Sequence, residues 1–122
     1  MSPSRNYTDL IAWQKAMNLT VSVYQATNLM PREEQFGLTS QMRRAAVSIP
    51  SNIAEGQGRG SDPAFLNHLS IAHGSLRELE TQLMLAERLE FLGGASVRNV
   101  LEEASEVGRL INGLANSIEA RS

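Results

Sequence analysis

The sequence predicts an all-α protein, an antiparallel up-down-up-down bundle of four helices that forms one domain over residues 1–122. Apolar residues recur at steps of three and four along four segments, which is the spacing of one helix face. Short connections that contain glycine or proline separate these segments, and short connections make consecutive helices antiparallel. No run of four or more residues alternates between apolar and polar in the manner of a strand.

The first helix is expected over about residues 9–28. Thr8 is its predicted N-cap, because a threonine hydroxyl can accept a hydrogen bond from a backbone N–H group of the first turn. Asn28 and Pro31 mark its end, since the residue before a proline avoids helical backbone angles. Its apolar residues form one stripe and a second group that lies largely on other faces. The stripe is Leu10, Trp13, Met17, Val21 and Tyr24, and the second group is Ala12, Ala16, Leu19, Val23 and Ala26.

The second helix is expected over about residues 39–57, with a kink at Pro50. Residues 32–36 are expected to form a single turn before it, and Thr39 or Ser40 to cap it. One face is apolar on both sides of the proline, so the helix is predicted to continue through it. An interior proline removes one backbone hydrogen bond and presses its ring against the carbonyl of Ala46, at a cost of roughly 3 kcal/mol.

The third helix is expected over about residues 63–90 and the fourth over about residues 97–120. Asp62 can cap the third helix, whose first position suits Pro63, and Gly93-Gly94 marks its end. Ser96 is the predicted cap of the fourth. Both helices carry apolar or small residues at alternating steps of four and three, which predicts packing at shallow crossing angles. These seams are Phe65, Leu69, Ala72, Leu76, Leu79, Leu83 and Ala86 in the third helix, and Val97, Leu101, Ala104, Gly108, Ile111, Ala115 and Ile118 in the fourth.

The first helix is apolar nearly all round, and no charged residue occurs between Lys15 and Arg32. Such a helix is buried nearly all round, whereas each helix of a small bundle should keep one face in water. The surplus apolar surface predicts a homo-oligomer with the first helix near the subunit interface. The alternative is that the apolar residues outside the seams are isolated surface side chains, which are ordinary. The predicted interface residues are Leu19, Val23, Ile71, Leu85 and Leu110.

The charge and composition restrict the classes of function. The chain has 11 Lys and Arg against 13 Asp and Glu, a formal net charge of -2 with a pI near 5.7. Nucleic-acid-binding domains are typically basic, so this balance argues against a strong role of that kind. The lack of cysteine excludes disulfides and thiolate metal sites. The sequence shows neither an apolar leader nor the roughly 20 apolar residues of a membrane span, so a cytoplasmic protein is expected.

The protein is predicted not to be an enzyme, and no catalytic residue, cofactor or metal is expected. Di-iron bundles need Glu-x-x-His pairs that project into the core, and no glutamate stands three residues before a histidine. His68 and His73 are five residues apart, about 140° around a helix, so they cannot share a metal ion. The glycine-rich segment over residues 56–60 lacks the strand and the lysine of a phosphate-binding loop, and is expected to be a flexible turn at a helix end.

A specific motif occupies the middle of the second helix, Ser48-Ile49-Pro50-Ser51-Asn52-Ile53-Ala54-Glu55-Gly56. It stands out together with Asp9-Leu10, Trp13-Gln14-Lys15-Ala16, Val23-Tyr24, the rest of residues 37–56, Arg59 and residues 71–80. Over roughly residues 7–92 the chain resembles a bacterial four-helix-bundle family encoded in intervening sequences of 23S ribosomal RNA genes. The resemblance implies an antiparallel four-helix bundle that assembles into a homopentameric ring or barrel. For most members of this family the molecular function is unknown.

A related branch of that family is the accessory variability determinant of diversity-generating retroelements. It is a basic pentamer that binds nucleic acid and a reverse transcriptase, whereas the chain described here is acidic. Two classes of function therefore remain open. One is a non-enzymatic homo-oligomeric scaffold or adaptor that binds RNA, DNA or a nucleic-acid-handling protein. The other is a purely protein-binding or structural oligomer without nucleic-acid contact.

Lys15, Arg43, Arg44 and Arg59 are the candidate nucleic-acid contacts in the first class. A guanidinium group suits the geometry of phosphate oxygens. One subunit has too few of these cations for a strong patch, but a ring repeats each of them and can concentrate their field despite the negative net charge.

Overall fold

Four α-helices and two 3-10 turns make up the computed structural model, which describes residues 6–121. The helices are α1 (Ile11–Thr27), α2 (Leu38–Gly58), α3 (Asp62–Arg88) and α4 (Gly94–Arg121). The turns η1 (Tyr7–Asp9) and η2 (Arg32–Glu34) precede α1 and α2. The described residues contain no strand, so the prediction of an all-α protein with four helices is confirmed.

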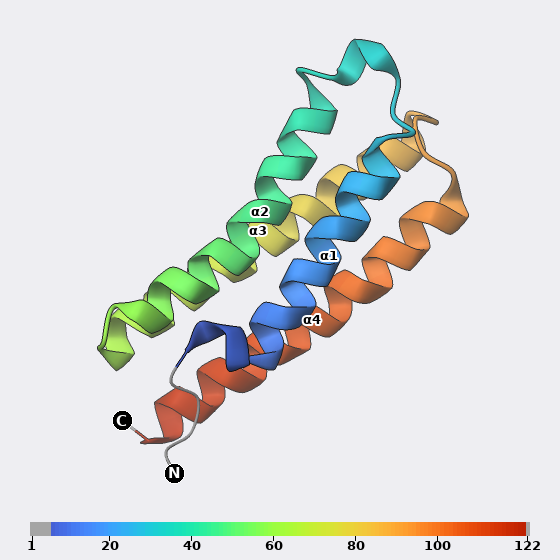
Figure 1. Ribbon diagram of the computed structural model, residues 1–122. Helices are drawn as coiled ribbons and strands as arrows, with labels where there is room; N and C mark the ends of the chain where they lie inside the picture. The colour runs from blue at the N-terminus through green and yellow to red at the C-terminus, as the bar shows by residue number, and fades with distance from the viewer. Residues whose placement is uncertain (1–5, 122) are drawn as a thin grey trace.

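The four helices lie side by side along their lengths (Figure 1). The α1–α2 and α3–α4 connections are at one end of the molecule, and the α2–α3 connection is at the other end. Each helix packs against the next one along the chain, and α4 packs back against α1. Within residues 6–121 no Cα atom of α1 lies within 8 Å of one in α3, and the same holds for α2 and α4, so these pairs are diagonally opposite and the four helices surround one central core.

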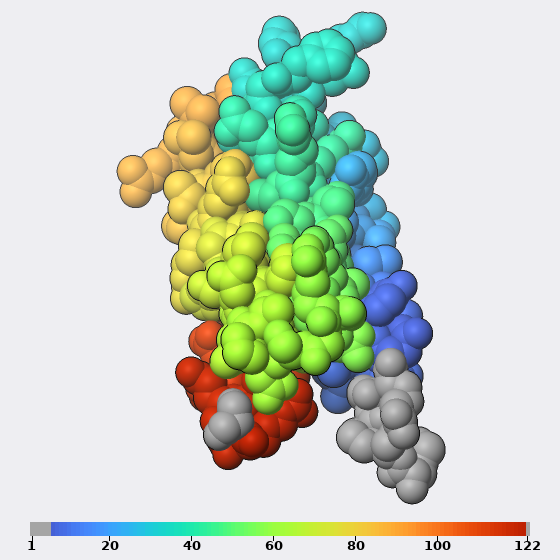
Figure 2. All heavy atoms as spheres, turned by 90° about the vertical axis from the view of Figure 1, so that its left-hand side faces the viewer, coloured from blue at the N-terminus to red at the C-terminus, as the bar shows by residue number. Residues whose placement is uncertain are grey.

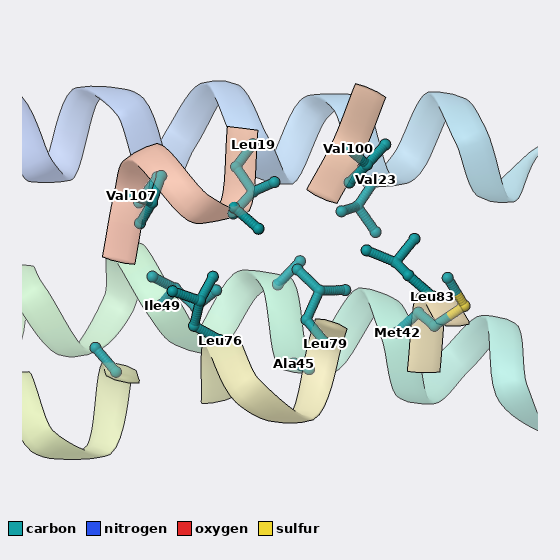
Figure 3. Close-up of a cluster of buried hydrophobic side chains, with 14 of the residues drawn as sticks. Leu19, Val23, Met42, Ala45, Ile49, Leu76, Leu79, Leu83, Val100 and Val107 are labelled. Atoms are coloured by element: carbon teal, nitrogen blue, oxygen red, sulfur yellow. The ribbon is translucent and has the colours of Figure 1, made fainter. Parts of the chain in front are cut away.

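Buried side chains from all four helices meet in the centre of the bundle (Figure 3). The predicted seam of α3 is buried at every position from Phe65 to Ala86, and the predicted seam of α4 is buried or half-buried throughout. The largest fully buried side chains are Leu19, Val23, Met42, Ile49, Ile53, Leu69, Leu76, Leu79, Leu83, Val97, Ile111 and Ile118.

The expectation that Leu19 and Val23 line a subunit interface is wrong. Both side chains are fully buried, and both point into the core in Figure 3. The packed face of α1 is the group that contains three alanines, Ala12, Ala16, Leu19, Val23 and Ala26. Helices approach one another more closely where the side chains between them are small. Of the stripe with larger side chains, Met17, Val21 and Tyr24 face outward and are exposed, whereas Leu10 and Trp13 are partly buried against the core.

The starts of α1 and α2 differ from the predicted ones. Thr8 does not cap α1 but lies within η1. The cap of η1 is Asn6, whose side-chain oxygen accepts a hydrogen bond from the backbone N–H of Thr8 at 2.9 Å. Only then does α1 begin, at Ile11, without a side-chain cap. The predicted caps Thr39 and Ser40 both lie inside α2, because the helix starts at Leu38. A carboxylate oxygen of Glu34 accepts from the backbone N–H of Leu38 at 3.1 Å and takes the capping role.

The bounds of α3 and α4 also differ by a few residues. The N-cap of α3 is Ser61, whose hydroxyl accepts from the backbone N–H of Ala64, so Asp62 is already helical. At its end α3 stops at Arg88, and Glu90 takes the left-handed conformation that usually selects glycine, with φ 61°. α4 begins at Gly94, ahead of the predicted cap Ser96.

Pro50 lies in the interior of α2 and is buried. The helix continues on both sides of it from Leu38 to Gly58. On the neighbouring helix, the hydroxyl of Thr20 lies 3.2 Å from the carbonyl oxygen of Ala46, which is the group that the proline leaves without a helical donor. The proline is therefore accommodated by a contact between α1 and α2.

Candidate subunit interface

An apolar groove runs along the surface between α1 and α2. Side chains of α1 form one wall, side chains of α2 form the other, and Tyr7 of η1 closes one end. The rings of Tyr7 and Trp13 meet there edge to face, with their centroids 5.4 Å apart. The lining residues are Tyr7, Trp13, Met17, Thr20, Val47, Pro50, Ser51 and Ala54.

Large apolar side chains beside this groove are open to water. Val21 is 55% exposed, and Met17, Tyr24 and Val47 are each exposed by more than two fifths. From Ala16 to the end of α1 no side chain is charged. A contiguous apolar surface of this kind on a small protein marks a site of interaction with another molecule. We call it the α1/α2 groove and define it by its lining residues together with Val21 and Tyr24.

Arg43 lies over the ring of Tyr24 and forms several hydrogen bonds near the end of α1. Its guanidinium group donates to the Thr27 hydroxyl at 2.8 Å, to the Asn28 side-chain oxygen at 3.1 Å and to the Tyr24 carbonyl at 3.4 Å. The same group lies 4.6 Å from the centre of the Tyr24 ring, in cation–π geometry. Arg43 thus joins α2 to the end of α1, and these bonds would have to break before it could contact a phosphate.

The other candidate nucleic-acid contacts are spread over the surface. Arg59 forms an exposed ion pair with Glu55 at 2.7 Å, and this hydrogen bond, followed by the charge of His68, lowers the pKa of the Glu55 carboxyl. Arg59 directly follows α2 and is sixteen residues from Arg43, which is about 24 Å along a helix. Arg44 and Lys15 are exposed and have no hydrogen-bond or ion-pair partner within residues 6–121. The structure therefore does not gather the four cations into one patch.

Two of the remaining predicted interface residues are exposed. Ile71 and Leu85 on α3 are 45% and 44% exposed. Leu110 on α4 is only half-buried and packs against the core. Met17, Val21 and Tyr24 are not among the interface residues predicted from the sequence, which on α1 were Leu19 and Val23.

The specific motif of α2 packs directly against α3. The Ser48 and Ser75 hydroxyls lie 2.8 Å apart, and the Asn52 amide donates to the Ser48 carbonyl at 2.9 Å. The Asn52 side-chain oxygen lies 3.0 Å from Nδ1 of His68. Since that oxygen can only accept, Nδ1 of His68 carries the hydrogen. A polar seam, formed on the α2 side by Ser48 and Asn52 of the motif, therefore joins α2 to α3.

Gly56 completes this seam at the end of α2. A Cβ atom at position 56 would lie 2.6 Å from Cβ of His68 and 3.2 Å from the ring of Phe65. Only glycine lets the two helices approach so closely at this point. The motif thus has a packing role on its α3 side, while Pro50, Ser51 and Ala54 line the α1/α2 groove on its other side.

Features of catalytic or metal sites are sparse in the described part of the chain. No group of three or more His, Cys, Asp or Glu within residues 6–121 is placed to hold a metal ion. The buried Nε2 atom of His73 lacks a hydrogen-bond partner among these residues, beside a shallow hollow between α3 and α4. None of the helices within residues 6–121 combines the length and the apolar character that a membrane crossing requires.

Comparison with known proteins gives a family and a fold. Residues 8–113 match the family described as 23S rRNA-intervening sequence protein. A solved structure from Bacteroides thetaiotaomicron, described as a protein with unknown function from the S23 ribosomal protein family, has a similar fold with a TM-score of 0.81 and 23% sequence identity. The similarity covers 87% of this chain and 96% of that one. No curated protein matches this chain.

Proposed function

We propose, from the premise that this chain belongs to the 23S rRNA-intervening sequence protein family, that it is a non-enzymatic, homo-oligomeric scaffold. Each subunit of the scaffold is an up-down-up-down bundle whose second helix bends at Pro50. The resemblance described above implies five subunits in a ring. The α1/α2 groove is the surface through which one copy binds another.

The observation that carries this proposal is the exposure of large apolar side chains on a helix without charge. Met17, Val21 and Val47 offer apolar area that water covers at a cost of about 25 cal/mol for each Å². Isolated exposed leucines would need no explanation, but Met17 and Val47 line one groove, and Val21 lies one turn from Met17 on α1. Burial of that groove by another copy supplies the driving force for assembly.

The side chains favour the form of the scaffold that lacks nucleic-acid contact. Arg43 is engaged by α1 and Arg59 by Glu55, so two of the four candidate contacts are already paired. Lys15 lies two residues before Met17, roughly 200° around α1, and so points away from the groove. Titration of labelled single-stranded RNA and duplex DNA at low salt tests the alternative, and binding of either below tens of micromolar protein would favour the nucleic-acid adaptor instead.

Gel filtration coupled to light scattering tests the proposal on the full chain. Val21→Glu places a charge in the groove and should lower the mass toward the 13.4 kDa of one chain without loss of helix. Asn116→Glu is the matched control, because Asn116 is an exposed residue of α4 outside the groove. A wild-type monomer at micromolar concentration, or equal effects of both substitutions, would contradict the proposal.

A further inference from the structure

We propose that the α1/α2 groove of one copy receives the outer face of α3 from a second copy, with Arg44 of the first paired to Glu78 of the second. This inference rests on the proposed homo-oligomer and specifies which two surfaces meet. The outer face of α3 is defined by Ile71, Gly74, Glu78, Thr81 and Leu85, which recur at steps of three and four.

The outer face of α3 carries exposed apolar side chains on both sides of a glycine. Ile71 and Leu85 are each more than two fifths exposed, and Gly74 lies between them in sequence. This stripe begins two residues after the buried seam residue Leu69, so it points away from the core of its own chain. The face therefore presents apolar side chains at its two ends and the carboxylate of Glu78 between them, and a helix face of this kind can pack into a groove between two helices.

Gly74 has no explanation within its own chain. Glycine in the middle of a helix is unfavourable relative to alanine, and α3 extends for twelve residues before Gly74 and fourteen after it. At Gly56 and Gly108 an added Cβ would meet atoms of α3 at 2.6 and 3.1 Å, which explains both glycines. A Cβ at Gly74 would meet nothing within 4 Å, as at Gly113 in α4, but Gly74 differs from Gly113 in sharing its helix face with the exposed apolar side chains of Ile71 and Leu85. Close approach by a helix of another copy would explain why no side chain is present there.

The two surfaces carry complementary charges. Beside the groove, Arg43 is engaged by α1, and Arg44 is left exposed without a partner within residues 6–121. On α3, Arg77 pairs with Glu80 at 2.7 Å, whereas the exposed Glu78 accepts only a 3.3 Å bond from the Gln82 amide. A cation on one surface and a carboxylate on the other are therefore available to each other.

The spacing of these residues is compatible with one register. Pro50 in the groove and Arg44 are six residues apart, about 9 Å along α2. Gly74 and Glu78 are four residues apart, about 6 Å along α3. In this register Gly74 of the second copy lies over Pro50 of the first, and α3 of the second copy runs antiparallel to α2 of the first. The long side chains of Arg44 and Glu78 can then bridge the difference between the two spacings.

This pairing also determines the type of symmetry. Figure 2 shows α2 in the middle of one face of the molecule, with α3 on one side and α1 on the other. The α1/α2 groove and the outer face of α3 are thus different surfaces of the same subunit. Contacts between two different surfaces repeat head to tail and close into a ring when the rotation permits. A twofold dimer would instead use the same surface on both copies.

Charge reversal on the full chain tests the inference by light scattering over a concentration series. Arg44→Glu and Glu78→Arg should each raise the concentration of half-dissociation about tenfold, and the double variant should return to within about threefold of wild type. Arg109→Glu, at an exposed arginine on α4, is the control and should leave the assembly unchanged. Circular dichroism checks that every variant keeps its helix content.

Two failures can be told apart. A wild-type monomer would overturn both the oligomer and this pairing. A wild-type oligomer that neither single reversal weakens, or that the double variant does not restore, would overturn the pairing alone. Gly74→Leu gives an independent readout: it should dissociate the assembly while the subunit stays folded, and an intact assembly would contradict the proposed contact.

Discussion

The Thr20 hydroxyl on α1 lies 3.2 Å from the Ala46 carbonyl oxygen on α2, four residues before Pro50. Proline has no N–H group, so this carbonyl lacks its usual helical donor. The same hydroxyl lies 2.8 Å from the carbonyl of Ala16 in its own helix, and therefore shares one hydrogen between two acceptors. The interior proline of α2 is thus linked to a particular side chain of α1.

Thr20→Val should destabilise the protein by about 1–3 kcal/mol, because it keeps the side-chain shape but leaves the Ala46 carbonyl without a donor. Denaturant unfolding monitored by circular dichroism measures the loss. In a Pro50→Ala background the same substitution should cost less, since the alanine introduced there would supply the backbone N–H that the carbonyl lacks. An equal cost in both backgrounds would show that the hydroxyl does not serve this carbonyl.

Pro50→Ala should leave a folded bundle in which α2 is straighter or shifted. The gain in helix propensity, about 3 kcal/mol, should be partly or wholly cancelled if a bend at Pro50 is needed to pack Ile49 and Ile53. Thermal unfolding gives the net change in stability, and the mass of the assembly shows whether the groove still binds another copy. A large rise in melting temperature with unchanged assembly would mean that the proline does no structural work.

Arg43→Lys should destabilise the protein by about 1–2 kcal/mol, although it keeps the positive charge. A lysine cannot reach Thr27, Asn28 and the face of Tyr24 together, because it lacks the planar fork of donors. Arg44→Lys is the matched control on the adjacent residue and should change the free energy of unfolding of the subunit by less than about 0.5 kcal/mol. Equal effects of the two substitutions would contradict a structural role for Arg43.

Gly56→Ala should cost about 1–3 kcal/mol, because its Cβ would overlap His68 and force α2 away from α3. Gly113→Ala is the control in the interior of α4, where an added Cβ meets nothing within 4 Å, and it should stabilise by up to about 1 kcal/mol. The comparison separates close packing from helix propensity. If Gly56→Ala also stabilised the protein, the close contact would be of no consequence.

Glu90→Gly should stabilise the protein by about 0.5–1 kcal/mol, since glycine adopts a positive φ without strain. Glu90 follows α3, where the backbone N–H of Phe91 bonds back to the Ala86 carbonyl at 2.8 Å. Glu87→Gly, inside α3, should instead destabilise by about the helix penalty of glycine, near 1 kcal/mol. A loss of stability from Glu90→Gly would argue against a strained conformation at this position.

The sequence was most informative where only one group of residues had helical spacing. The buried face of α3 was predicted residue by residue from Phe65 to Ala86, because that seam is apolar at every position, whereas the outer face of α3 has large apolar side chains only at Ile71 and Leu85. In α1 two apolar groups repeat at helical spacing, and the choice between them depends on how closely the neighbouring helices approach. The larger side chains suggested one face, and the alanines packed the other.

Contacts between helices account for most of what the sequence could not predict. The partners of Arg43, Thr27 and Asn28, are sixteen and fifteen residues away at the end of α1, and no local spacing connects them with Arg43. Glu34 caps α2 from a turn outside the helix, so the local Thr39 and Ser40 signals were misleading. Ile71 and Leu85 of the candidate interface could be identified from the sequence as apolar residues outside the seam. The groove could not, because it depends on which face of α1 points outward.

Trp13 gives the most direct test of whether the groove is covered by another copy, because it is the one tryptophan in the chain and lines the groove. Iodide quenching of its fluorescence is measured on the unmodified protein over a dilution series, alongside the mass from light scattering. The account predicts weak quenching in the assembly and stronger quenching as the mass falls toward 13.4 kDa. A monomer at every micromolar concentration, or quenching that stays constant while the assembly dissociates, would contradict it.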